Sequence, residues 1–202
     1  MGYLLPGEYE AYGLAEDTGD EWVRVASAMI EAHCRRASLM LTEYVERLRM
    51  TAGAHTVRLS YGPLAAGAVT SVRVRYGQAR RGEFGEAMLA QVATAFGVPG
   101  SWSTLDPAQV DLNAGAREVT FASSFLGLSY NEAEVTYSAG FVTVPVAVKV
   151  ACAQIVKNAQ ATPALNVKTS KLDTMQMEYF SGSLLDAQVQ ALLRPFVAGR
   201  LG

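Results

Sequence analysis

Residues 134–163, EVTYSAGFVTVPVAVKVACAQIVKNAQATP, decide the fold class because they combine one strand with one helix. The first part alternates apolar and polar residues, which predicts a half-buried strand that ends at Gly140. The continuation is ambiguous, since alternate valines after Gly140 would also suit a strand. We predict a helix, because Pro145 suits a first turn with Thr143 as its cap, and Pro163 would stop it. The expected apolar stripe of this helix consists of Val148, Ala151, Cys152, Ile155 and Ala159.

Upstream, an aperiodic arm (residues 1–17) precedes a second amphipathic pattern. Thr18 with Glu21 three residues later fits a capping box, so a helix should begin near residue 19 and end by residue 38. Its expected apolar face consists of Trp22, Val25, Ala26, Met29, Ile30, His33 and Ala37.

The following segments change to a period of two. Apolar and polar residues alternate over 44–50, 56–61 and 71–76, which predicts half-buried antiparallel strands. Gly62 and Pro63 mark a turn between the second and third of them.

Residues 77–131 interrupt this pattern. We interpret them as an insertion between two strands, with a short helix at 86–96, a turn-rich connector and a strand at 118–121. Their apolar content is too small for an independent core, so residues 1–202 should form a single domain.

The C-terminal arm, residues 164–202, contains a polar extended stretch and a last helix that starts near Ser183 and Asp186. The predicted class is therefore α+β and mainly helical. A small helix bundle would carry an antiparallel β-layer, an insertion between strands and an extended C-terminal arm that ends in a helix.

Composition narrows the function. Hydrophobic residues make up 50% of the 202 residues and charged residues only 18%, which suggests that partners cover some apolar surface; an apolar core alone would explain it equally well. The net charge of −2 and the absence of a basic stripe disfavour a dedicated DNA binder. We expect no signal peptide and no membrane span, and we expect Cys34 and Cys152 to be buried free thiols.

No motif for catalysis, metal binding or cofactor binding emerges. Residues 62–70 resemble a phosphate-binding loop superficially, but Ala68 replaces the required lysine. His33 and Cys34 are neighbours on a helix and point about 100° apart, so they cannot form a nucleophile–base pair. The two cysteines and two histidines lack the spacing of a zinc site. We therefore expect no enzyme, no catalytic or metal-binding residues and no cofactor.

Aromatic and methionine residues gather in the two arms instead. Such residues outside the periodic core are typical of interface anchors, which we expect here; the alternative is that they fold back on their own domain. The candidate partner-interface residues are Tyr3, Tyr9, Tyr12, Met175, Met177, Tyr179, Phe180, Leu193 and Phe196.

The order of these patterns resembles a known family. An acidic-start helix leads to the segment VxSVxVxYG at 69–77. A strand that ends Tyr-x-Ala-Gly-Phe at 137–141 then precedes Val-Pro145, a helix with Lys149, and a last helix that ends near Arg194. Over residues 16–76 and 133–197 the chain is similar to the head–tail connector, or adaptor, proteins of tailed bacteriophages and phage-derived particles. The insertion at 77–131 departs from that pattern.

The resemblance implies a virion structural protein assembled in the host cytoplasm. It implies a self-assembled ring of about twelve subunits at the virion neck. That ring would bind the portal protein, line the channel through which DNA passes without specific binding, and dock the tail or a head-completion protein. Two alternatives remain. One is a head-completion or tail-terminator neck protein; the other is a small cytosolic enzyme or ligand-binding domain with a dispersed site.

Overall fold

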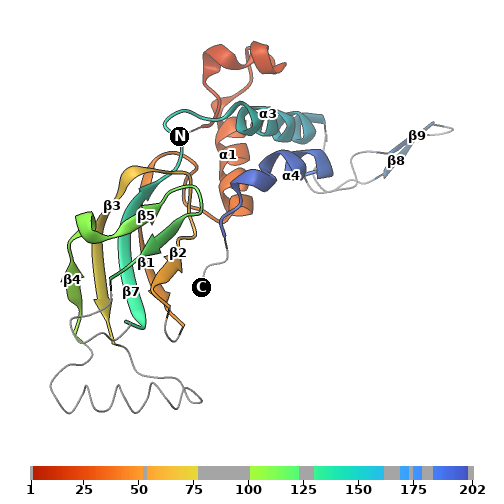
Figure 1. Cartoon of the computed structure of the whole chain (residues 1–202). Coiled ribbons are helices and arrows are strands. Elements are labelled where there is room, and N and C mark those ends of the chain that lie inside the picture. Colours follow the sequence, from red (N-terminus) through yellow and green to blue (C-terminus); the bar gives the residue numbers. More distant parts are fainter. Residues whose placement is uncertain are drawn as a thin grey trace. The chain divides into compact units, whose positions relative to one another are not determined.

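The computed structural model describes residues 2–51, 54–76, 101–122, 130–161, 169–172, 175–178 and 184–199. The chain divides into two compact units, each with its own buried side chains. Unit 1 comprises residues 1–39 and 141–197, and unit 2 comprises residues 40–140 and 198–202. Unit 2 is therefore inserted into the sequence of unit 1 (Figure 1).

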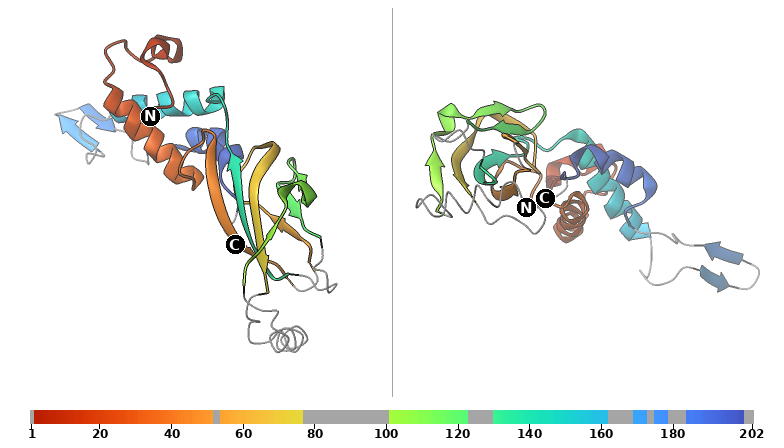
Figure 2. Two further views of the ribbon diagram at one scale, coloured as in Figure 1. Left: turned by 90° about the vertical axis from the view of Figure 1, so that its left-hand side faces the viewer. Right: turned by 60° about the horizontal axis from the view of Figure 1, so that its bottom comes forward.

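Unit 2 contains two antiparallel sheets with a common hydrophobic core (Figure 2). The four-stranded sheet has the order β1-β7-β3-β4, and the three-stranded sheet has the order β2-β6-β5. The bounds are β1 Thr42–Arg49, β2 Thr56–Arg58, β3 Leu64–Arg75, β4 Ser103–Leu105, β5 Asp111–Asn113, β6 Glu118–Thr120 and β7 Glu132–Ala139; the short helix η3, Pro107–Gln109, precedes β5.

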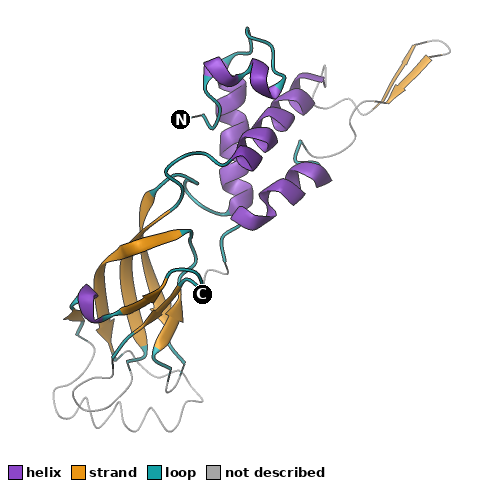
Figure 3. Ribbon diagram, turned by 45° about the horizontal axis from the view of Figure 1, so that its top comes forward, coloured by secondary structure: helices purple, strands orange, loops and turns teal. Residues whose placement is uncertain are grey.

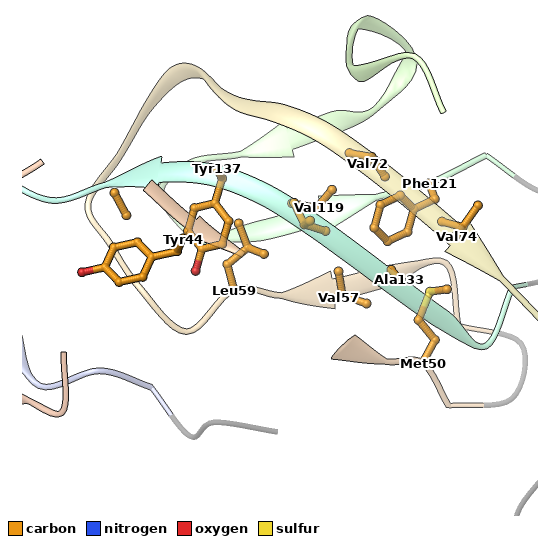
Figure 4. Close-up of a cluster of buried hydrophobic side chains, with 12 residues drawn as sticks. Tyr44, Met50, Val57, Leu59, Val72, Val74, Val119, Phe121, Ala133 and Tyr137 are labelled. Atoms are coloured by element: carbon orange, nitrogen blue, oxygen red, sulfur yellow. The ribbon is translucent and has the colours of Figure 1, made fainter. Parts of the chain in front are cut away.

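The alternation predicted from the sequence determines which side chains enter this core. Strand β7 is buried at every second residue, and its neighbours β1 and β3 follow the same rule over much of their length. Figure 4 shows the buried cluster, to which both sheets contribute. Its members are Tyr44, Met50, Val57, Leu59, Val72, Val74, Val119, Phe121, Ala133, Val135, Tyr137 and Ala139.

Unit 1 is built from helices. Helix α3 packs against both α1 and α4 (Figure 3), and the N-terminal segment adds two short helices. The bounds are η1 Pro6–Glu8, η2 Glu10–Tyr12, α1 Asp20–Cys34, α3 Val146–Ala161, α4 Ala187–Leu193 and η4 Arg194–Phe196. Between α3 and α4 the chain forms a hairpin of β8, Thr169–Leu172, and β9, Met175–Glu178.

The helices predicted to begin near residues 19, 145 and 183 are confirmed, and so are the strands at 44–50, 56–61, 71–76, 118–121 and 134–141; most ends shift by a few residues, and β3 begins seven residues earlier than predicted. The prediction of a mainly helical fold is wrong: the described residues form nine strands and three α-helices, so the fold is a sheet-rich α+β fold. The error lies largely in residues 101–122, where strands of only three residues are too short to show a period. The helix expected at 86–96 lies outside the described residues.

The predicted face of α1 is also partly wrong. Trp22 and Val25 are exposed, at 41% and 54%, whereas Ser27 is buried. Ser27 lies toward α3, where its Oγ is 3.9 Å from Cys152 Sγ, and it donates a hydrogen bond to the Val23 carbonyl. A small residue suits this helix contact better than a large apolar one.

The predicted capping box of α1 does not form. Gly19 is the N-cap and makes no side-chain capping bond. The Thr18 hydroxyl is buried and has no hydrogen-bond partner within the part of the chain that the structure describes.

Candidate partner interface

The N-terminal arm folds back on the helices of unit 1. Of the two alternatives for its aromatic residues, an exposed interface anchor or packing on their own domain, Tyr3 and Tyr9 follow the second. Tyr3 and Tyr9 are only 4% and 2% exposed. The Tyr3 hydroxyl donates to Glu31 at 2.7 Å and accepts from the Leu39 N–H at 2.9 Å. The Tyr9 hydroxyl donates to Asp20 at 2.7 Å, and burial raises the pKa of Tyr9 to about 12. These two tyrosines hold the arm in place and offer little surface to a partner.

The other candidates in unit 1 have different environments. Leu193 is fully buried in the helical core, so it is also not a surface anchor. Tyr12 is half-buried. Phe196 is half-buried too, and its ring lies edge-on to Phe141 with 5.6 Å between centroids. Of these residues, only Tyr12 and Phe196 keep part of their surface accessible.

The candidates of the C-terminal arm lie in or near the β8–β9 hairpin. Met175 pairs with Leu172 and Met177 pairs with Ser170 across the hairpin. Tyr179 and Phe180 lie outside the described residues.

The residues 137–149, on which the resemblance to connector proteins rests, have structural roles. Tyr137 is buried in unit 2, where its hydroxyl donates to Glu46 at 2.7 Å and accepts from the Tyr61 N–H at 3.2 Å. Gly140 has a φ of 129°, which favours glycine, and its N–H donates to the Pro63 carbonyl.

The second half of this stretch starts helix α3. The carbonyl of Pro145 accepts the N–H groups of Val148 and Lys149, and the Lys149 ammonium pairs with Glu8 of the N-terminal segment. Residues 137–149 therefore form the turn from β7 into α3 and the attachment of the arm, and they contain no chemistry of their own.

Sequence reasoning missed a set of exposed apolar side chains. Val146 and Val150 lie one turn apart on α3 and are 67% and 37% exposed, and Val142 just before them is 82% exposed. Trp22 and Val25 lie three residues apart on α1 and share a face of that helix. The sequence did contain a signal for this surface. The alternate valines after Gly140 would also suit a strand, and when they form a helix they place apolar residues on more than one of its faces.

Sequence reasoning also missed a charged surface on the four-stranded sheet. Four arginines stand at alternate positions of two strands, Arg47 and Arg49 on β1 and Arg73 and Arg75 on β3. Trp102 lies just before β4, and the guanidinium groups of Arg47, Arg73 and Arg75 are 5.2, 5.4 and 4.6 Å from its ring centroid. We call these five residues the arginine face. Pairs of arginines two residues apart in a strand were its only sequence signal.

Unit 1 has a shallow open depression of about 390 Å³ beside the N-terminal segment. Its only charged lining residues are Asp20 and Arg24, and Asp20 is already bonded to Tyr9. The lining consists of Gly2, Leu4, Leu5, Pro6, Tyr9, Asp20, Val23 and Arg24.

The two thiol groups of the chain are inaccessible. Cys34 and Cys152 are buried free thiols, and burial raises the pKa of each to about 11, which disfavours the reactive thiolate. Within the described ranges no group of three or more His, Cys, Asp or Glu side chains could hold a metal ion. No helix in that part of the chain is both long enough and apolar enough for a membrane span.

No family model matches the chain, and no curated protein is significantly similar to it.

Proposed function

We propose that this chain is a virion structural protein, a subunit of the head–tail connector ring between portal and tail of a tailed bacteriophage or phage-derived particle. The observation that carries the proposal is the set of exposed apolar side chains on α1 and α3. Apolar surface of this kind, away from the core of the same chain, is typical of a subunit that becomes covered on assembly.

The resemblance of residues 137–149 to connector proteins suggests which kind of assembly the subunit would join. These residues form the turn between β7 and α3 and the start of that helix, so they maintain a fold. This suits a protein whose output is geometric: it completes a channel and offers docking surfaces to the portal and to the tail or a head-completion protein. The near-neutral net charge of −2 suits a channel that passes DNA without gripping it.

Particles that lack the protein test the proposal. Electron microscopy should show DNA-filled heads that carry the portal, together with separate tails that fail to join. Normally tailed particles would overturn the proposal, and heads that never package DNA would assign the protein to an earlier step.

Purified protein gives a second test. Negative-stain images of the full chain mixed with the portal of the same particle should show a ring on the portal. The quadruple variant W22S/V25S/V146S/V150S should lose the ring while its circular dichroism stays unchanged, because none of these side chains is buried. Leu5→Ser, which changes an exposed apolar residue of the N-terminal segment outside both helices, is the control.

A further inference from the structure

The arginine face has a regular geometry that follows from strand register. In the strand register, Arg47 on β1 and Arg73 on β3 both lie opposite Glu134 of β7, the strand between them. Arg49 and Arg75 lie opposite Glu132 in the same way. Two rows, each of arginine, glutamate and arginine, therefore cross three strands side by side, with four positive and two negative charges.

Glu132 lies deeper than the two arginines that it binds. Glu132 accepts from Arg47 at 2.8 Å and from Arg75 at 2.7 Å, and its side chain is only 13% exposed. Glu134 accepts from Arg73 at 3.0 Å. The side chains of Arg47 and Arg73 remain 52% and 45% exposed. A ligand that approaches the sheet would therefore meet guanidinium groups first, stacked around the indole of Trp102.

Unit 1 carries a surface of the opposite charge. Between residues 8 and 21 the chain has six carboxylates and neither lysine nor arginine. We call this stretch the acidic segment; its carboxylates are Glu8, Glu10, Glu16, Asp17, Asp20 and Glu21.

Half of these carboxylates have partners within unit 1. Glu8 pairs with Lys149, Asp20 accepts from Tyr9, and Glu21 pairs with Arg24. The other three, Glu10, Glu16 and Asp17, are exposed and form no ion pair with another described residue. They leave a cluster of negative charge on a segment that Tyr3 and Tyr9 hold in a defined conformation.

We propose that the arginine face of one copy binds the acidic segment of a second copy. Tryptophan and arginine are the residues most enriched at the energetic centres of interfaces, and carboxylates are the groups that guanidinium forks bind best. The two surfaces are different parts of the chain, so the contact is heterologous: each copy uses one surface toward each of two neighbours, and a repeated rotation closes into a ring. The inference deepens the proposed function, since it names a subunit contact of the ring.

Charge reversal on each surface tests the contact. The variants are R47E/R73E and E10K/E16K/D17K in the full chain, compared with wild type by sedimentation at high protein concentration and low salt. Each variant alone should weaken self-association about tenfold or more, because like charges then face each other. Self-association of wild type should also weaken in about 1 M salt, where the screening length falls to about 3 Å. The control R35E/R194E makes the same charge change as the arginine-face variant at two exposed positions of unit 1 outside the acidic segment, and it should associate like wild type.

Mixing the two variants distinguishes a contact between copies from one within a copy. In an equimolar mixture every reversed surface finds a complementary partner on the other variant, so association should return to the wild-type level. If association returns only when one chain carries both sets of changes, the contact is intramolecular and the proposal is wrong.

Three other results would also overturn the proposal. The wild-type chain could stay monomeric, or neither variant could change its self-association. In the third, wild type binds duplex DNA, and R47E/R73E loses that binding but keeps self-association. The last result would assign the arginine face to phosphate groups. The proposed function fails separately, if particles lacking the protein are normally tailed although the purified chain associates through these surfaces. Conversely, a ring on the portal that is insensitive to both reversals would leave the proposed function standing and remove this contact.

Discussion

Tyr137 and Glu46 show how a few polar side chains join the two sheets of unit 2. Glu46 is 8% exposed and accepts two hydrogen bonds, from the Tyr137 hydroxyl at 2.7 Å and from the Ser60 N–H, just after β2, at 3.1 Å. Burial raises the pKa of Tyr137 well above its usual range, so the hydroxyl stays protonated and donates. A buried carboxylate with both oxygens satisfied stabilises the unit, whereas a half-satisfied one would destabilise it.

Loss of the Tyr137 hydroxyl should therefore be costly. We expect Tyr137→Phe to lower the free energy of unfolding by about 1–3 kcal/mol, because Glu46 and the Tyr61 N–H each lose a buried partner. The control is Tyr130→Phe, which keeps the ring that packs against Tyr76 at 5.1 Å. Urea unfolding followed by circular dichroism measures both, and equal stabilities for the two variants would contradict the role of Tyr137.

Two β-branched residues on α1 give a matched pair. Ile30 is fully buried, so Ile30→Ala should cost about 2–5 kcal/mol through the cavity that it leaves. Val25 is 54% exposed, so Val25→Ala should stay within about 0.5 kcal/mol of wild type, since alanine also favours a helix. Denaturant unfolding measures the free energy of unfolding of both variants. A similar loss for the two would mean that Val25 is part of the core.

At the scale of elements, α4 is held by the residue just before it, Asp186. The Asp186 carboxylate caps the helix by accepting from the Val189 N–H at 2.7 Å, and it accepts from the side-chain amide of Asn158 on α3 at 3.1 Å. Val189 and Leu193 then enter the core of unit 1. The last helix is thus part of the helical unit, although the sequence suggested the end of an extended arm.

The cap predicts a pH dependence. The hydrogen bond from the Val189 N–H, followed by that from Asn158, lowers the pKa of Asp186 from its ordinary value. A carboxyl with a lowered folded-state pKa stabilises fully above its unfolded pKa, and this contribution is lost as the pH falls through the folded value. Asp186→Ala should therefore cost about 1 kcal/mol at neutral pH and less below about pH 3.8. Thermal unfolding across this range measures it, with the exposed Asp17→Ala as control; a loss independent of pH would contradict the capping role.

At the scale of the whole molecule, the chain enters unit 2 after residue 39 and leaves it after residue 140 at one place, and it returns to unit 2 at residue 198. Thr42 pairs with Ala139 where β1 begins and β7 ends, and the Phe141 N–H donates to the Leu39 carbonyl at 2.9 Å in unit 1. The first two of the three crossing points are therefore adjacent, as is typical of an inserted domain.

This topology predicts that residues 40–140 fold when expressed alone. The fragment contains both sheets and their core, so it should show a β-type circular dichroism spectrum and a cooperative thermal transition. A fragment of residues 40–122 is the control: it lacks β7, which lies between β1 and β3, and should not fold. If the fragment of residues 40–140 shows no cooperative transition, the stability of unit 2 depends on unit 1.

The sequence by itself determined the long elements: α1, α3 and the strands β1, β3 and β7, because burial of one face imposes a period that a single chain displays. The sequence also shows no familiar catalytic or metal-binding motif. Only the tertiary structure decided three further features. The short strands of residues 101–122 exist because neighbouring strands pair with them, and three residues show no period. Tyr3, Tyr9 and Leu193 became core residues because burial depends on what a side chain meets across the fold. The arginine face formed because strand register aligns residues about 60 to 85 positions apart, a distance over which local patterns contain no information.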